Sequence, residues 1–501
     1  MDEGINKYLK WGLIGGAWLF VLVYIALAII RIGYPFELEW MEGGVVDHCR
    51  RILSGENIYV SPSVDFVPYI YTPLYYYLSA FFMKIFGAGF TVPRLISFIA
   101  SLGCMLIIYS FVRRETGSKL SAFLSAALYA AAYRFNGAWY DLARVDSLYL
   151  LFCLSAIYVI RKTNSITVII PAIALTLAYF TKQSALVLIL CSGVYYVFTN
   201  RKQALVYWIT IIICLLGLSV WFYRNTDGWF YYYTWLLPQS HDILRNSFVS
   251  FWPDFIFKGT SPILIVSAFY MMIVKKEKCR FKSFYFLVIV LGLIGSSYFQ
   301  WIHSGAYDNA FIPASAGISL IFGVIFNKLV VYAQTYDSRW VRLLLVVAII
   351  QFSCFVYLPH HQIPTSDDRK SGEDFICQVR ALHGDVFIRD HGYYATLAGK
   401  RSTAHSMAIF DVIREPELTV HGVAPADLLK MNIIRHIAHH RFTAVIVDNK
   451  SGFPDTDLLE EYFNSNRRIF DSNWGFFTLV GSEYRPDKVY FNKPYSKAVI
   501  D

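Results

Sequence analysis

The sequence predicts a polytopic α-helical membrane protein with a soluble α/β domain at its C-terminal end. Hydrophobic residues make up 56% of the 501 residues and charged residues only 16%, whereas about a quarter of an ordinary soluble domain is charged. Apolar runs of spanning length recur as far as residue 358. Beyond it, short apolar runs alternate with polar stretches. We therefore expect a transmembrane domain over 1–358 and a soluble domain over 359–501.

The first apolar run covers residues 11–30. Because a signal-peptide core has only ~7–15 residues and ends at a small-residue cleavage site, which is missing here, we expect this run to be a retained span. With it, the chain has about eleven apolar runs that we expect to be transmembrane helices. The others occupy approximately residues 93–112, 120–133, 146–160, 165–180, 184–199, 204–222, 261–274, 283–302, 310–327 and 343–358.

Basic residues between these runs predict the orientation. Every second connection is rich in lysine and arginine, and the positive-inside rule places those connections in the cytoplasm together with Lys7 and Lys10. The basic connections are 113–119, 161–162, 201–202, 275–282 and 328–342. We therefore expect a multi-pass protein of the cell (plasma or inner) membrane, with a cytoplasmic N-terminus and an extracytoplasmic C-terminal domain.

One apolar segment, residues 72–84, conflicts with this orientation. If it crossed the membrane, every basic connection after it would move outside. Its tyrosines and its start at Pro73 suit an interfacial helix instead. We therefore expect interfacial helices within a long outward loop over residues 31–92.

The net charge of +9 does not indicate nucleic-acid binding, because the basic residues lie in short clusters between apolar runs. The eight cysteines include no CxxC motif, which argues against a zinc site of that type. In the C-terminal domain, residues 385–390 and 443–448 are predicted strands with a helix over 428–440 between them. No glycine-rich nucleotide motif accompanies them.

The outward loop opens with a cluster of carboxylates. Glu37, Glu39, Glu42 and Asp47 lie directly after the first span, with Trp40 and Met41 among them. A solvated loop, or acidic residues in the first turn of a helix, would explain the carboxylates alone. The apolar neighbours favour a carboxylate held against an apolar wall, where burial raises its pKa and makes it a better base.

Several short motifs resemble one family in their order and their side of the membrane. The chain is similar to the GT-C superfamily of membrane glycosyltransferases, in particular the branch with protein O-mannosyltransferases and the bacterial aminoarabinose transferases of lipid A. The likeness covers about residues 10–330. It rests on Glu42-Gly43, Thr72-Pro73-Leu74-Tyr75-Tyr76, Pro93-Arg94-Leu95, Arg113-Arg114, Arg144 to Leu148, Thr181-Lys182 and Tyr307 to Pro313.

The resemblance implies an inverting hexosyl- or pentosyltransferase that uses a polyprenyl-phosphate-linked sugar and an acceptor lipid, glycan or protein. The family's first acidic residue falls on Met41, which cannot accept a proton. The catalytic base therefore stays open between Glu42, Glu39 and, third, Glu37. The transferred proton needs such a carboxylate, and the leaving phosphate needs fixed cations or a metal.

Cationic residues at the outer ends of spans are the candidates for the donor phosphate: Lys182, Arg144, Arg94, Arg134 and His303. The expected substrate-lining residues are Tyr71, Tyr75, Tyr307 and Asp308. Span-end cations also snorkel to the interface, and Arg144 with Asp146 could be a structural ion pair. His303 with Asp308 could bind a divalent metal or cap a span, so the metal stays unknown and no cofactor is certain.

Two other classes of function compete with the glycosyltransferase. A transporter or flippase of lipid-linked glycans would place charged residues in mid-span, whereas here they collect at the outer ends. A non-enzymatic glycan-assembly protein would use the C-terminal domain for binding. The aromatic loop 229–235 fits sugar stacking, lipid entry or an interfacial belt.

Overall fold

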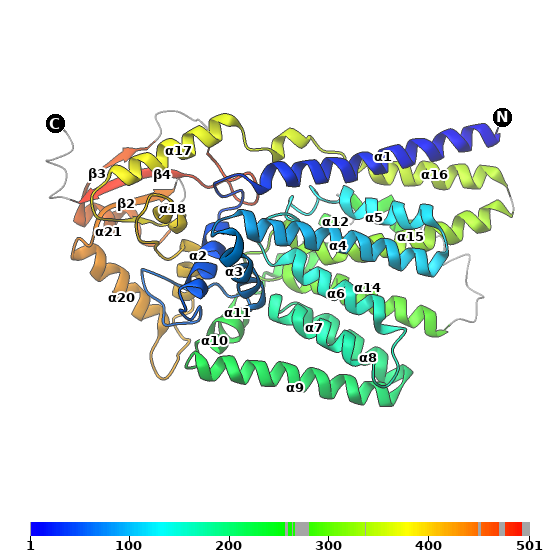
Figure 1. The fold of residues 1–501 in the computed structure, drawn as a ribbon, viewed down its shortest axis with the longest axis horizontal. Helices are drawn as coiled ribbons and strands as arrows, with labels where there is room; N and C mark the ends of the chain where they lie inside the picture. Colours follow the sequence, from blue (N-terminus) through cyan, green and yellow to red (C-terminus); the bar gives the residue numbers. More distant parts are fainter. Residues whose placement is uncertain are drawn as a thin grey trace.

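The structure is a computed structural model that describes residues 2–255, 259–262, 264–265, 280–335, 337–448, 452–469 and 476–492. Every predicted apolar run coincides or overlaps with a helix except 261–274, most of which lies outside the described residues. The helices that match the predicted runs lie side by side in a bundle (Figure 1). They are α1 (Asp2–Ile32), α4 (Thr91–Thr116), α5 (Lys119–Ala131), α6 (Asp146–Ile160), α7 (Ile169–Thr181), α8 (Ala185–Thr199), α9 (Arg201–Asn225), α14 (Arg280–Trp301), α15 (Ile312–Gln334) and α16 (Ser338–Ser353).

Five helical segments of the described residues are long and apolar enough to cross a membrane: Gly4–Ile32, Thr91–Thr116, Arg201–Asn225, Phe284–Trp301 and Asp308–Gln334. This makes the chain a multi-pass membrane protein. Five further apolar helices are shorter, among them α5 to α8. Their packing against the long helices buries faces that would otherwise meet lipid. Tertiary contacts, and not the length of each helix alone, therefore determine their place in the bundle.

Short turns join neighbouring helices because the sequence ends and restarts them locally. Gly117 takes the left-handed conformation that ends α4, with φ of 71°. Ser118 follows, and its hydroxyl accepts the Ser121 backbone N–H at 3.1 Å, which caps α5. Asn200 caps α9 in the same way. The chain therefore reverses direction within a few residues and sets adjacent helices antiparallel.

The predicted interfacial segment 72–84 corresponds to α3 (Leu74–Phe86), and it packs on α2 (Glu42–Leu53). Figure 1 shows both at the end of the bundle that faces the C-terminal sheet, not alongside the long helices. Three short helices follow α9, namely α10 (Trp229–Tyr231), η1 (Tyr232–Leu236) and α11 (Leu237–Ser240), and then α12 (Arg245–Phe255). The aromatic loop 229–235 thus forms helical turns, with Tyr232 and Tyr233 buried.

The C-terminal residues form a four-stranded sheet in the order β1-β2-β4-β3. Strands β1 (Asp385–Ile388) and β2 (Phe442–Asp448), which match the two predicted strands, run parallel, and β4 (Pro486–Asn492) pairs antiparallel with β2 and with β3 (Phe463–Arg468). The predicted helix 428–440 is α20 (Pro425–Ala438). The other helices of this part are η4 (Pro359–Gln362), α17 (Ser366–Ala381), α18 (Gly392–Leu397), α19 (Ser406–Ile413) and α21 (Thr456–Tyr462), while η3 (Asp308–Phe311) precedes α15.

The acidic loop, which is the segment that carries Glu37, Glu39, Glu42 and Asp47, lies between the bundle and this sheet and contacts both. The Val480 backbone N–H donates to the Leu38 carbonyl at 3.0 Å. Trp40 stacks on Tyr484 with ring centroids 4.2 Å apart. The Ser402 hydroxyl donates to Asp47 at 2.6 Å. The loop is therefore buried, and the alternative of a solvated acidic loop is wrong.

Candidate active site

Glu42 forms a buried ion pair with Arg94. Its two oxygens accept hydrogen bonds from Arg94 Nε at 2.9 Å and Nη2 at 2.5 Å. They also accept the backbone N–H groups of Leu38 at 2.8 Å and Ala143 at 2.7 Å. Burial raises the pKa of the Glu42 carboxyl, but Arg94 and the two N–H groups outweigh it, and the pKa is lowered. Glu42 thus holds three chain segments together, and its lowered pKa favours the ionised carboxylate.

Arg94, a sequence candidate for the donor phosphate, spends its remaining N–H groups on backbone carbonyls. It donates to the carbonyl oxygens of Arg31 at 3.2 Å, Tyr34 at 2.6 Å and Phe36 at 2.6 Å. The side chain is fully buried. Helix α4 therefore uses Arg94 to fix the path of the chain between α1 and α2, which places Glu37 and Glu39.

Glu39 and Arg144 face each other across one cavity. The Glu39 carboxylate lies 3.4 Å from Arg144 Nη1, and both side chains are at least nine-tenths buried. Within the described part of the chain, Glu39 Oε2 and the Nε and Nη1 atoms of Arg144 have no hydrogen-bond partner. Glu39 Oε2 and Arg144 Nη1 thus face each other as an ion pair without a hydrogen bond. Buried polar atoms without hydrogen bonds are costly, so a ligand that supplies such bonds would be favoured here.

The environment gives Glu39 the properties of a base. Burial raises its pKa, Arg144 lowers it and Glu42 raises it again, with a net value of about 7. Such a carboxyl is ionised in part at neutral pH and accepts a proton more readily than an exposed glutamate. Burial also raises the pKa of Glu37 to about 7, but Glu37 does not line this cavity.

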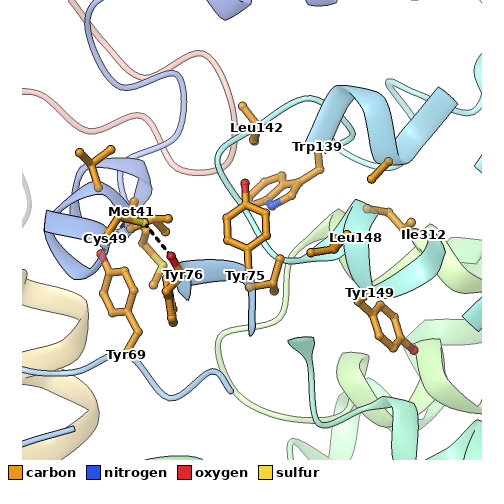
Figure 2. Packing of buried hydrophobic residues seen from close by; sticks show 14 of the residues in the cluster. Met41, Cys49, Tyr69, Tyr75, Tyr76, Trp139, Leu142, Leu148, Tyr149 and Ile312 are labelled. Carbon is orange, nitrogen blue, oxygen red and sulfur yellow. Dashed lines mark hydrogen bonds between the residues drawn. The ribbon is translucent and has the colours of Figure 1, made fainter. Parts of the chain in front are cut away.

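The cavity has about 80 Å³ of space open to water. The hydroxyl of Tyr71 accepts a hydrogen bond from Arg144 Nη2 at 2.9 Å. Met41 lines the cavity too, and Tyr69 donates to its carbonyl at 3.2 Å (Figure 2). The lining comprises Glu39, Trp40, Met41, Tyr69, Ile70, Tyr71, Trp139, Arg144, His241, Ser304, Gly305, Tyr307, Asn309, Met407 and Asp411.

Lys182 lies beside this cavity without lining it. Its Nζ is 2.6 Å from Asp146 Oδ1, which also accepts a hydrogen bond from Asn309 at 3.2 Å. Asp146 therefore pairs with Lys182, and the alternative pairing with Arg144 is wrong. Asn309 itself lines the cavity, so it joins the lysine–aspartate pair to the cavity wall.

Glu37 belongs to a second buried cluster, at the sheet. His391 contacts Glu37 through Nδ1, and its Nε2 lies 3.0 Å from Asp448 Oδ2. Burial alone would lower the pKa of His391, but the two carboxylates raise it well above its usual value. The Glu37–His391–Asp448 cluster joins the acidic loop to the ends of β1 and β2.

Of the other predicted site residues, only Tyr307 lines the cavity. Tyr307 lines it and its hydroxyl lies 3.0 Å from Ser482 Oγ, whereas Asp308 starts η3 outside the lining. Tyr75 is buried but does not line the cavity, and it donates to the Pro93 carbonyl at 2.7 Å. Arg134 is exposed. His303 Nδ1 lies 2.7 Å from the Phe299 carbonyl, near the end of α14.

The residues present do not assemble a metal site. In the ranges that the structure describes, no three histidine, cysteine, aspartate or glutamate side chains group closely enough to hold a metal ion. His303 uses one ring nitrogen on the backbone. We therefore derive no step through a divalent metal.

Three features of the site escaped the sequence analysis. Arg31 at the end of α1 pairs with Asp141 at 3.2 Å, both fully buried. His391 and Asp448 follow or end two predicted strands, and the carboxyl ends of parallel strands meet at one edge of a sheet, so this signal was present in the sequence. Asp411 carried no such signal, because only the docking of α19 brings it to the cavity.

The overall fold matches solved structures along almost the whole chain. Crystal structures of ArnT from Cupriavidus metallidurans, bound to undecaprenyl phosphate and in the apo state, match with TM-scores of 0.58 and 0.59. Each covers 95% of this chain and 98% of ArnT at 13% sequence identity. The chain has the GT-C fold.

Two further comparisons accompany this GT-C fold. A family model for dolichyl-phosphate-mannose-protein mannosyltransferases matches residues 70–223, which run from just before α3 to the last turn of α9. An oligosaccharyltransferase from Archaeoglobus fulgidus, tethered to an acceptor peptide, matches with a TM-score of 0.49 at 13% identity, covering 93% of this chain and 74% of that one. No curated protein sequence matches the chain.

Proposed function

We propose that this GT-C protein is an inverting glycosyltransferase that moves a sugar from a polyprenyl phosphate to a lipid, glycan or protein acceptor. The observation that carries the proposal is the buried ion pair of Glu39 and Arg144, which lines one cavity and leaves Glu39 Oε2 and Arg144 Nε and Nη1 without hydrogen bonds to the described residues. The family match supports the reaction, and the undecaprenyl phosphate bound to ArnT supports the class of donor.

In the proposed reaction, an acceptor hydroxyl or amine attacks the anomeric carbon of the donor sugar. The bond from that carbon to the phosphate oxygen breaks, and the phosphate leaves with the electron pair. Glu39 takes the proton that the acceptor loses. Among the three glutamates, Glu39 is favoured because Glu42 has every oxygen paired to a buried donor and Glu37 lies at the sheet.

The leaving phosphate needs fixed positive charge in a site from which water is largely excluded. Arg144 supplies it through Nε and Nη1, with Tyr71 holding its third nitrogen. Lys182 adds a second buried cation next to the cavity, held by Asp146. Arg94 positions the acidic loop, and exposed Arg134 and half-buried His303 stay candidates for the lipid headgroup region.

The proposed orientation puts this cavity outside the cytoplasm of the cell membrane, with residues 1–358 as the membrane domain and 359–501 as an extracytoplasmic domain. A cysteine replacing exposed Lys119, in a chain with Cys279, Cys354 and Cys377 changed to serine, tests it. The cysteine should react with an impermeant maleimide only after the cells are opened. Labelling of this cysteine in intact cells would contradict the proposed orientation.

The reaction is tested with the full purified chain and radiolabelled undecaprenyl-phosphate mannose, glucose and arabinose. The wild type should release labelled sugar to an acceptor or to water. Glu39→Gln should lower the rate about 10²–10⁴-fold, the usual contribution of a general base. Glu417→Gln, at an exposed glutamate, is the matched control. Full activity of Glu39→Gln would refute the assignment of the base.

A further inference from the structure

The C-terminal part of the chain supplies one wall of the cavity. Met407 and Asp411, both on α19, line it together with His241, which follows α11, and Ser304, which follows α14. None of these residues belongs to the proposed base or the phosphate contacts. The cavity therefore has a polar region made jointly by the C-terminal domain and the loops of the bundle.

The polar groups of this region are buried and incompletely paired. Asp411 is 3% exposed and His241 7%. Asp411 Oδ1 lies 2.9 Å from Arg414 Nη2 and 3.5 Å from His241 Nε2, yet it makes no hydrogen bond of good geometry with the described residues, and neither does His241 Nε2. Arg414 Nη1 donates to Ser304 Oγ at 3.1 Å. Asp411 Oδ1 is thus ion-paired with Arg414 but makes no hydrogen bond within the described ranges, and buried polar atoms without hydrogen bonds are costly unless a ligand supplies them.

The protonation states favour a neutral, hydroxyl-rich ligand. Burial lowers the pKa of His241 to about 3, so the ring is neutral and its Nε2 either accepts or donates one hydrogen bond. Burial raises the pKa of Asp411 to about 7, with Arg414 lowering it and Glu415 raising it. The Asp411 carboxylate would repel a phosphate group. Arg144, elsewhere in the cavity, is the cationic partner for a phosphate.

Flat aromatic faces complete the region. Trp139 and Tyr307 line the same cavity with ring centroids 6.0 Å apart and an angle of 25° between their planes. Trp139 Nε1 is buried and has no partner among the described residues. A saccharide ring carries both an apolar C–H face for such rings and adjacent hydroxyls for carboxylate, imidazole and indole groups.

We propose that Asp411, His241 and Ser304 form a hydroxyl-recognition subsite for a saccharide ring. It rests on the proposed function, and it makes the C-terminal domain part of the active site. Asp411 accepts hydrogen bonds from neighbouring hydroxyls, and His241 and Ser304 fix their positions. The ring belongs either to the donor sugar or to a glycan acceptor, and both present the same hydroxyl chemistry.

The test uses the full chain in detergent micelles and three probes: undecaprenyl phosphate, undecaprenyl-phosphate mannose and methyl α-D-mannoside, with the glucose and arabinose forms in parallel. Binding is followed by tryptophan fluorescence, since Trp40 and Trp139 line the cavity. Asp411→Asn should weaken binding of a saccharide probe about ten-fold, the effect of losing one charged hydrogen bond. Asp374→Asn, at an exposed residue of α17, is the matched control.

The pattern across probes identifies the ring. Weaker binding of the sugar-linked lipid, with undecaprenyl phosphate unchanged, assigns the subsite to the donor sugar. Weaker binding of the methyl glycoside alone assigns it to the acceptor. Unchanged binding of all probes, or equal weakening for undecaprenyl phosphate, overturns the proposal.

Folding is checked by the midpoint of thermal unfolding, and Ser304→Ala and His241→Gln carry the same test if Asp411→Asn unfolds. A failure of the proposed function looks different from a failure of the subsite. In that case the wild type would neither transfer nor hydrolyse any labelled sugar, while saccharide binding would still depend on Asp411.

Discussion

Replacing Glu42 by glutamine should destabilise the protein more than it impairs the chemistry directly. The carboxylate accepts four hydrogen bonds at 2.5–2.9 Å, two of them from Arg94, and none of it is exposed. Glutamine keeps the size but removes the charge, and its NH₂ group then faces donors. Arg94 is left as a buried cation without a counter-charge.

Breaking one side of a buried ion pair in this way costs about 3–5 kcal/mol. Because the pKa of Glu42 is lowered in the folded state, its contribution to stability is present above the pKa of the unfolded chain and lost as the pH falls through the folded value. The Glu42→Gln variant should therefore lose most stability near neutral pH and differ less from the wild type in acid.

The assay is denaturant unfolding of the purified chain in micelles, beside the rate of sugar release. Glu39→Gln is the matched comparison: it also breaks a buried ion pair, but one at 3.4 Å without a hydrogen bond, so it should lose less stability than Glu42→Gln while it loses its activity. The double variant Glu42→Gln/Arg94→Gln should be less destabilised than the two single variants added together. The reasoning is refuted if Glu42→Gln unfolds like the wild type but is as inactive as Glu39→Gln, because Glu42 would then be the base.

Three other predictions follow from the same contacts. The value of kcat/KM should rise with pH as Glu39 ionises, with a midpoint at about pH 7. Arg144→Gln should move this midpoint upward, since the arginine lowers the pKa of Glu39. A midpoint that the substitution does not move contradicts the pairing. Tyr71→Phe should lower the rate, because the Arg144 guanidinium loses its hydrogen bond to the Tyr71 hydroxyl. Tyr75→Phe should cost about 1 kcal/mol of stability with little loss of rate. Equal rates in both variants would show that Tyr71 has no role in the reaction. His391→Asn should leave the buried carboxyl groups of Glu37 and Asp448 facing each other. The residues after 358 should then be more sensitive to protease, while the midpoint of the pH profile stays the same. Protease resistance equal to that of the wild type would show that the cluster does not hold these residues to the acidic loop.

The helices of this protein could be predicted because their signals are local. Apolar runs, glycine and asparagine at the turns, and the basic connections are read within a few residues, and all the runs in the described ranges recur as helices. The strands at 385–390 and 443–448 were equally local, as uninterrupted apolar stretches. The carboxylate cluster was visible for the same reason.

The roles within that cluster could not be read from the sequence. Glu37, Glu39 and Glu42 are the same residue type within six positions, yet they face three different partners. Arg94 comes from α4, Arg144 from the loop before α6, and His391 from the C-terminal domain. The pKa of each carboxyl depends on which cation reaches it after burial.

By itself, the sequence determined the membrane character, the helices and the acidic loop with its candidate bases. The tertiary contacts add that Glu42 is hydrogen-bonded to Arg94, that Glu39 pairs with Arg144 without a hydrogen bond to Oε2 from the described residues, and that Asp411 reaches the same cavity. The physical reason is that hydrophobic length and turn signals act over a few residues, whereas pairing and desolvation of charges depend on segments that are up to several hundred residues apart in the chain.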